Sequence, residues 1–274
     1  MSRIIFLIKN QINRLEFKIS FFILILLSVG GVAMGYIKNY EKSLEFVRSA
    51  ADNFLLTSTD ASVVGMLFSF LFPLMAASLC SGYKKGKEKT GNVLFPLLRM
   101  NKRQFIYGNA LVTVGLTVIS FMLILGLNQL LCFVAFPLSG ADNRWGQLPY
   151  ELIRQFHPEC LFDIWTIQNP YVYNLLYIGI ISVLAGGIAL LTYGLGYTKR
   201  FERLKPVQLS ALVFAMFIGL FIGSEFLDIS TISFLSFLEP GHSVSTKQYI
   251  IFAGCIYVAG IILTIKGKKT YEAI

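Results

Sequence analysis

The chain has 274 residues, of which 55% are hydrophobic and 14% are charged, and its formal net charge at pH 7 is +9. A soluble domain carries about 25% charged residues, and the mean hydropathy here is positive, at +0.66. Water is therefore not the solvent that this composition suits. The excess of positive charge could indicate a nucleic-acid partner, but its distribution along the chain indicates membrane topology instead.

The first 18 residues, MSRIIFLIKNQINRLEFK, precede a long apolar run. Their apolar residues recur near helical spacing and basic residues occupy much of the remainder, which is typical of an amphipathic helix at a membrane interface. We expect such a helix over 1–18; a basic tail that only orients the first span is the alternative. The run that follows is too long for a signal-peptide core and lacks a clear cleavage site, so we expect an uncleaved anchor.

Six apolar segments are long enough to cross a membrane, which takes about 20 mostly apolar residues. They cover residues 19–37, 61–81, 105–136, 174–197, 208–227 and 248–265. As a helix the third would be roughly 48 Å long, more than the roughly 30 Å hydrocarbon core, so it tilts, projects from the membrane or breaks near Gly126. Glycines in the first and fourth segments suggest close helix packing. The sequence predicts a single all-α transmembrane domain over 1–274.

The loops between these segments differ sharply in charge. Of the 24 Lys and Arg residues, 18 lie on one side and 6 on the other. The side with 18 comprises residues 1–18, 82–104, 198–207 and 266–274. The side with 6 comprises residues 38–60, 137–173 and 228–247. Because cytoplasmic flanks are enriched in Lys and Arg, we expect a plasma-membrane protein with both termini in the cytoplasm.

The same distribution limits the partners. The basic flanks suit contact with anionic membrane lipid. No soluble part of the chain is large enough to supply a nucleic-acid-binding surface, so we expect no nucleic-acid partner. In the last outer loop, residues 229–238 are too apolar for a solvated loop and too short to span, and we expect a pair of short re-entrant or interface-lying helices there.

Sequence motifs of soluble catalysis are absent. The chain has no GxxxxGK[ST] phosphate loop, no GxSxG elbow and no HExxH helix. Its four cysteines and two histidines lack metal-ligand spacing. We therefore expect a protein that is not an enzyme, with no catalytic residue, metal or cofactor on this chain.

Few polar residues fall inside the apolar segments. Glu225 is ionisable, and an ionisable residue within a span marks a functional site by default, although from the end of its segment it can reach the interface. Asn128 and Gln129 are neutral, and interhelical hydrogen bonds are the simplest explanation for them and for Asn109. Glu225, Asn128 and Gln129 are our candidates for a transport pathway or a chain–chain interface.

The loop after the second span reads GYKKGKEKTGNVLFPLLRMNKRQF and holds an apolar cluster between two basic ones. A loop that only orients spans needs the charges alone. The apolar cluster therefore suggests a short helix that docks on membrane or protein; a hairpin lying on the surface is the alternative.

An interfacial N-terminal helix, six spans, this docking loop and the broken apolar stretch between the last two spans resemble the permease subunit of a type-2 ABC exporter. In that family the loop carries roughly E-x-x-x-G, an apolar pair and a polar-Arg element. The residues here that correspond to this coupling segment are Glu88, Gly91, Leu94, Leu97, Leu98 and Arg103. The resemblance implies that they form a coupling helix seated in a cleft of the ATPase subunit. Pro96, within the segment, departs from the pattern.

The resemblance also implies a mechanism and partners. An ABC ATPase on a separate chain would bind ATP and Mg and drive alternating access or lateral release, and a second permease chain, identical or paralogous, would complete the transporter. Small permeases of this family resemble those of bacterial systems that export antimicrobial peptides or protect the cell against them. This resemblance suggests a hydrophobic or amphipathic cargo, such as an antimicrobial peptide or a lipid-like molecule. The alternatives are a secondary transporter or channel, which needs no ATPase, and a non-transporting scaffold or sensor subunit.

Overall fold

In the computed structural model of the chain, the described residues are 2–41, 47–79, 102–140, 160–198, 200–201, 204–227, 233–238 and 244–272. Within these ranges the regular elements are helices and there is no β-strand. The fold class is therefore all-α, as the sequence predicts.

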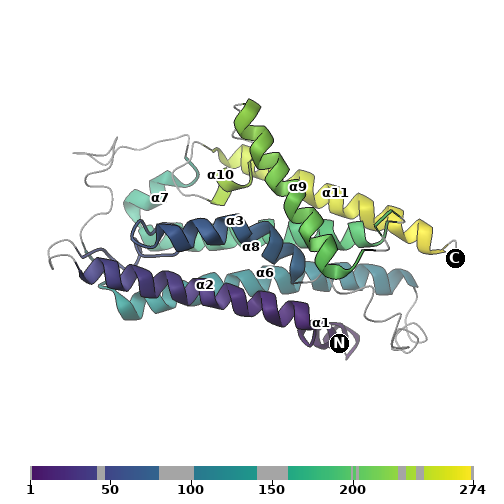
Figure 1. Cartoon of the computed structure of the whole chain (residues 1–274), viewed down its shortest axis with the longest axis horizontal. Coiled ribbons are helices and arrows are strands. Elements are labelled where there is room, and N and C mark those ends of the chain that lie inside the picture. The colour runs from purple at the N-terminus through teal and green to yellow at the C-terminus, as the bar shows by residue number, and fades with distance from the viewer. Residues whose placement is uncertain are drawn as a thin grey trace.

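The helices follow one another as a bundle of long rods with short helices between them (Figure 1). In chain order they are α1 (Ser2–Ile12), α2 (Leu15–Tyr40), α3 (Ser62–Ser78), α6 (Lys102–Ala135), α7 (Asp163–Gln168), α8 (Pro170–Gly196), α9 (Pro206–Leu227), α10 (Leu235–Leu238) and α11 (Thr246–Glu272). By length and composition α2, α6, α8, α9 and α11 can each cross a membrane, whereas α3 is apolar but has 17 residues. This architecture suits a multi-pass membrane protein.

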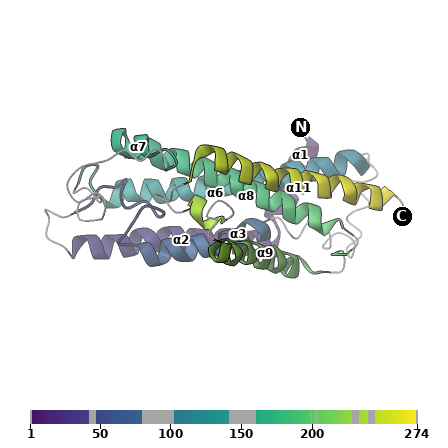
Figure 2. The same ribbon diagram turned by 90° about the horizontal axis from the view of Figure 1, so that it is seen from above.

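The two termini lie at the same end of the bundle in both views (Figures 1 and 2). We call this the proximal end. At the opposite, distal end α2 ends and α3 begins, and α6 ends near the start of α8. The consecutive helices α2, α3, α6 and α8 thus run in alternating directions along the bundle.

The join between the first two helices differs from the sequence expectation. The amphipathic helix α1 ends at Ile12 rather than at residue 18. The backbone of Arg14 is extended, with φ −78° and ψ 146°, so the chain changes direction there. Residues from Leu15 onward therefore belong to the long helix α2.

Helix α6 runs without interruption through Gly126 for 34 residues. At 1.5 Å per residue it is about 51 Å long. A break near Gly126 is therefore excluded, which leaves tilt or projection to accommodate the length. Figure 1 shows α6 running along most of the bundle.

Helix α8 lies at the centre and packs most extensively on α6 and α11. A Cβ on Gly186 would lie 2.7 Å from Val118 Cγ2 of α6 and 2.8 Å from the Tyr257 hydroxyl of α11. A Cβ on Gly194 would lie 2.9 Å from the carbonyl oxygen of Gly260 in α11. Missing side chains thus allow three helices to approach closely, which confirms the close packing expected for the fourth span.

The short helix α10 lies between α9 and α11 and is buried with the residue before it. The Phe234 ring is 5.9 Å from that of Phe217 in α9, and the Phe237 ring is 4.9 Å from that of Phe252 in α11. In both views α10 lies alongside the long helices rather than beyond their ends. A short apolar helix thus occurs where one was expected; the remainder of 229–238, up to residue 232, lies outside the described residues.

Candidate functional site

The coupling segment expected from the sequence cannot be placed. Its residues Glu88, Gly91, Leu94, Leu97 and Leu98 lie outside the described residues. Arg103 belongs to the start of α6, where only its backbone is described.

The three candidate pathway residues separate into two places. Asn128 and Gln129 are buried side by side on α6. Glu225 is exposed on α9, next to Phe226, whose exposed fraction is 87%. Helix α9 packs mainly on α3. The structure therefore joins Asn128 to Gln129 and leaves Glu225 on the outer surface of the bundle.

Asn128 and Gln129 face a buried loop at the distal end, residues 47–61, which we call the distal loop. It lies between α2 and α3 in the chain, leads into the start of α3 and has no long helix of its own. Ala50, Phe54 and Leu55 are at most 1% exposed. The amides of Thr57 and Ser58 both donate to the Phe54 carbonyl, at 2.9 and 2.8 Å, so the loop turns back into the bundle.

Asn128 connects two helices and the distal loop. Its Oδ1 accepts a hydrogen bond from the Leu55 amide at 2.9 Å. Its Nδ2 donates to the Ser28 carbonyl of α2, also at 2.9 Å. The interhelical bond expected for this residue is therefore present, and a loop bond is added to it.

Three further side chains bind main-chain carbonyls of the distal loop. Gln129 Nε2 donates to Ala50 at 3.2 Å, and Asn174 Nδ2 of α8 donates to Ala51 at 3.0 Å. Cys132 Sγ donates to Asn53 at 3.2 Å. The Asn174 amide also donates to Gln129 Oε1 at 2.8 Å, which links α8 to α6. With Asn128 these residues form what we call the latch: Asn128, Gln129, Cys132 and Asn174.

Leu55 sits in a notch between glycines. A Cβ on Gly31 of α2 would lie 2.5 Å from Leu55 Cδ1, and a Cβ on Gly65 of α3 would lie 2.8 Å from the Leu55 carbonyl oxygen. The Leu55 amide is the group that Asn128 binds. One loop residue therefore contacts α2, α3 and α6, and we call this arrangement the Leu55 socket.

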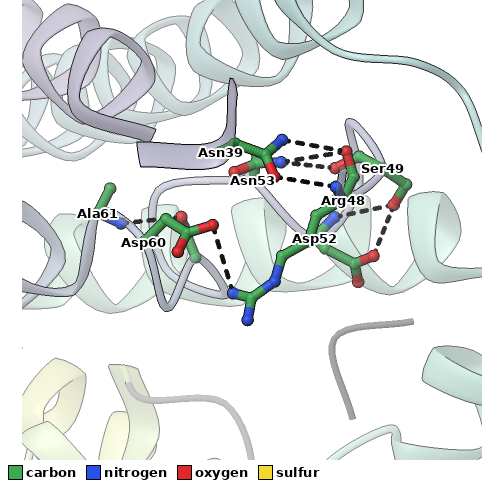
Figure 3. A network of polar contacts seen from close by, with 8 residues as sticks. Asn39, Arg48, Ser49, Asp52, Asn53, Asp60 and Ala61 are labelled. Atoms are coloured by element: carbon green, nitrogen blue, oxygen red, sulfur yellow. Dashed lines mark hydrogen bonds and ion pairs between the residues drawn. The ribbon is translucent and has the colours of Figure 1, made fainter. Parts of the chain in front are cut away.

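Most remaining polar contacts of the distal loop are internal or join it to the end of α2 (Figure 3). Asn53 Nδ2 donates to the Ser49 carbonyl at 3.0 Å, and Ser49 Oγ donates to Asp52 Oδ2 at 2.7 Å. Asn39 of α2 accepts from the Arg48 amide at 3.0 Å and donates to its carbonyl at 3.4 Å. The start of the loop is thus anchored to α2.

An ion pair closes the distal loop on itself. Arg48 Nη1 lies 3.5 Å from Asp60 Oδ2, and the two side chains are 21% and 10% exposed. The pair joins the first residues of the loop to the last. Because the side chains are shielded from solvent, their attraction is less screened than that of a surface pair.

Asn109 differs from the other amides of α6. Its side chain is fully buried, and neither of its amide atoms has a hydrogen-bond partner in the described structure. One turn further along α6, Thr113 accepts a 3.1 Å bond from Gln11 of α1. The interhelical bond expected for Asn109 is therefore not found, and a buried amide without a partner costs about 1–3 kcal/mol.

The chemistry of the latch is neutral. Three primary amides and one thiol present donors and acceptors to main-chain groups, so the arrangement suits hydrogen bonding rather than proton transfer. Among the described residues no group of three His, Cys, Asp or Glu side chains could hold a metal ion. Sequence reasoning identified Asn128 and Gln129 and missed Asn174 and Cys132, whose partners are loop carbonyls and leave no side-chain motif.

Comparisons of the chain with protein-family models, with curated proteins and with solved structures each returned no match.

Proposed function

We propose that this chain is the permease subunit of a type-2 ABC exporter, with a separate ATPase subunit as its energy source. The observation that carries the proposal is the order of the elements. An amphipathic helix packs at the proximal end, apolar helices follow, and a buried short helix stands between the last two. In this arrangement α2, α3, α6, α8, α9 and α11 are the six spans, both termini are cytoplasmic, and the distal end faces outward.

Helix α1 supports a position at the membrane interface. Leu7 and Gln11 are 1% exposed and face the bundle, while Ile4, Ile5 and Phe6 are 50–55% exposed. The helix therefore has one packed side and one uncovered apolar side. Burial of the uncovered side in the headgroup region would stabilise it there.

The placement of charge supports an external energy source. Charged residues of the long helices lie near helix ends, as do Glu16 and Lys38 in α2 and Glu225 in α9. Ion-coupled transporters normally use carboxylates or charged pairs inside the membrane. ATP and Mg would bind the ATPase partner, and a second permease chain and membrane lipid would complete the assembly.

The latch supports an uncharged hydrogen-bonding cargo rather than an ion. Asn128, Gln129 and Asn174 bind main-chain amide and carbonyl groups of this chain. The same groups occur in a peptide of any sequence. A hydrophobic or amphipathic peptide, for example an antimicrobial one, is therefore the favoured cargo, and a lipid-like molecule is the next.

Recovery of the ATPase tests the proposal. A tagged chain purified from its native membrane in mild detergent should retain an ATPase subunit. The double variant Leu97→Asp/Leu98→Asp should lose the ATPase while still inserting in the membrane, because two carboxylates would be placed in the expected apolar contact. The matched control is Leu138→Asp, at a residue that is 67% exposed at the distal end, and it should retain the ATPase.

The outcomes separate the alternatives. If the unaltered chain never recovers an ATPase, the proposal fails and a secondary transporter, channel or scaffold is favoured. If the ATPase stays bound to the double variant, residues 88–103 are not the coupling segment.

A further inference from the structure

The distal loop closes the end of the bundle at which α2, α3, α6 and α8 meet, and its bonds divide into three sets. One set lies within the loop: Arg48 to Asp60, Asn53 to Ser49, and Thr57 Oγ1 to the Ala51 carbonyl at 3.1 Å. The second set is the latch, in which α6 and α8 hold the loop by its main chain. The third set joins the loop to other segments: the Arg48 amide donates to Asn39 of α2, and the Ala50 amide donates to the Pro137 carbonyl at 2.8 Å. The loop can therefore leave the helices without losing its internal bonds.

The latch bonds go to main-chain groups over a short stretch of the loop. Asn128, Gln129, Asn174 and Cys132 bind residues 55, 50, 51 and 53. Apart from these bonds, the Leu55 side chain enters the notch at Gly31. The start of the loop, at Arg48, is held separately by Asn39 at the end of α2. A movement that pivots at Asn39 would release the whole latch together with the bond from the Ala50 amide to the Pro137 carbonyl.

We propose that residues 50–55 form a detachable outer gate that the latch and the Leu55 socket hold shut. The gate rests on the proposed function, because its release would open the distal end for outward passage of cargo. Release removes Leu55 from between Gly31 of α2 and Gly65 of α3, which frees these two helices to separate. It also uncovers the amides of Asn128, Gln129 and Asn174, which can then bind the main chain of a passing peptide.

Cys132 supplies a reporter of this movement. Its side chain is fully buried, and its thiol donates to the Asn53 carbonyl. Release of residues 50–55 removes that cover. A chain in which Cys80, Cys160 and Cys255 are replaced by serine keeps Cys132 as its single thiol, and the rate of its reaction with a membrane-impermeant maleimide measures opening.

The first experiment uses this single-thiol chain in lipid nanodiscs without any ATPase. Asn128→Ala removes the bonds to the Leu55 amide and the Ser28 carbonyl and should speed labelling of Cys132 about tenfold or more. The matched control is Asn169→Ala, which removes an exposed amide that accepts from Tyr171 N at the start of α8. This control should label at the unaltered rate. Equal rates in the two variants would overturn the proposal.

A second reporter distinguishes gate opening from unfolding. Ala185 lies fully buried on α8. Ala185→Cys combined with Cys132→Ser gives a chain whose single thiol lies in the core. This thiol should stay unreactive in both asparagine variants. If Asn128→Ala makes position 185 reactive together with position 132, the opening is global and the gate does not exist.

The third experiment adds the ATPase and ATP. Cys132 in the otherwise unaltered single-thiol complex should label at least several-fold faster during ATP hydrolysis than with ADP. Labelling that is equally slow in both conditions would show a fixed plug and overturn the gate, even though an ATPase binds. If no ATPase binds, the proposed function fails, while the comparison of Asn128→Ala with Asn169→Ala still decides whether the loop detaches.

Discussion

Helices α8 and α9 are similarly apolar, yet they are buried in the bundle to very different extents. Over the apolar stretch of α8, 72% of the residues are buried, against 28% for α9. Helix α8 packs on α6, α11 and α3, whereas α9 packs mainly on α3. Hydropathy alone identifies both as spans and does not tell which one is central.

Contacts at glycine account for part of the difference. In α8, Gly186 and Gly194 lie where a Cβ would meet atoms of α6 and α11 at under 3.0 Å. In α9, Gly219 and Gly223 have no atom within 4 Å of a Cβ position. Both helices contain glycine, so the presence of glycine does not predict close packing. What distinguishes α8 is that Gly186, Gly187 and Gly194 face other helices, whereas its Gly179 has no atom within 4 Å of a Cβ position.

The largest effect is expected where the backbone of α11 lies against Gly194 of α8. Gly194→Val places its Cβ against the Gly260 carbonyl, and because backbone cannot move aside as a side chain can, the free energy of unfolding should fall by about 3 kcal/mol. Gly219→Val on α9 enters open space and should change it by less than about 0.5 kcal/mol. Denaturant unfolding in mixed micelles measures both. Equal losses would contradict the packing difference between the two helices.

A smaller effect is expected from removing a buried side chain. Ile188 of α8 is fully buried and Ile222 of α9 is 48% exposed. Ile188→Ala should cost about 2 kcal/mol of unfolding free energy, at the low end of the range for core truncation. The low value follows because lipid surrounds the chain before folding, so lost packing is the main term. Ile222→Ala serves as the control, and a cost as large as that of Ile188→Ala would refute the assignment of α9 to the surface.

A single hydroxyl gives a third, smaller contrast. The Tyr193 hydroxyl of α8 donates to the Ile106 carbonyl of α6 at 2.9 Å. Tyr193→Phe should lower the free energy of unfolding by about 1 kcal/mol. In α9 the Ser210 hydroxyl donates to the Pro206 carbonyl of its own helix at 3.1 Å, so Ser210→Ala should have almost no effect. The same unfolding measurement compares the two variants. If Tyr193→Phe left the free energy of unfolding unchanged, this interhelical hydrogen bond would not contribute to stability.

The smallest effect is expected at Phe226, which is 87% exposed on α9. Phe226→Ala should leave the unfolding free energy of the isolated chain within about 0.5 kcal/mol of its unaltered value. A larger loss in the isolated chain would place Phe226 in a packed environment and weaken the contrast with α8.

Hydropathy and charge predict the long helices well because each signal is repeated over many residues. The sequence prediction for α9 begins two residues after its observed start, and the helix ends at Leu227 as expected. The join between α1 and α2 is less predictable, because the extended backbone at Arg14 is a local event with no capping side chain to indicate it. The continuity of α6 at Gly126 is also hard to predict, because a single glycine does not interrupt the backbone hydrogen bonds of the helix.

The distal loop is the part of the site that sequence reasoning cannot supply. Asn128 and Gln129 are conspicuous as amides in an apolar run, and interhelical bonds explain them in part. The other partners are the Leu55 amide and the Ala50 carbonyl. Every residue carries such main-chain groups, so nothing in the sequence marks these two. The burial of Phe54 is equally hidden, because a single aromatic residue in a polar loop gives no periodic signal.

The Leu55 socket also fixes an order in the biosynthesis of the protein. Gly31, Leu55 and Gly65 belong to one hairpin, which can close as soon as α2 and α3 have left the ribosome. Asn128, which binds the Leu55 amide, comes 73 residues later. At about 5–20 residues per second this is a delay of roughly 4–15 s. During that interval the amide of Leu55 depends on water or lipid headgroups for a hydrogen-bond partner. The arrival of α6 then supplies Asn128 as that partner.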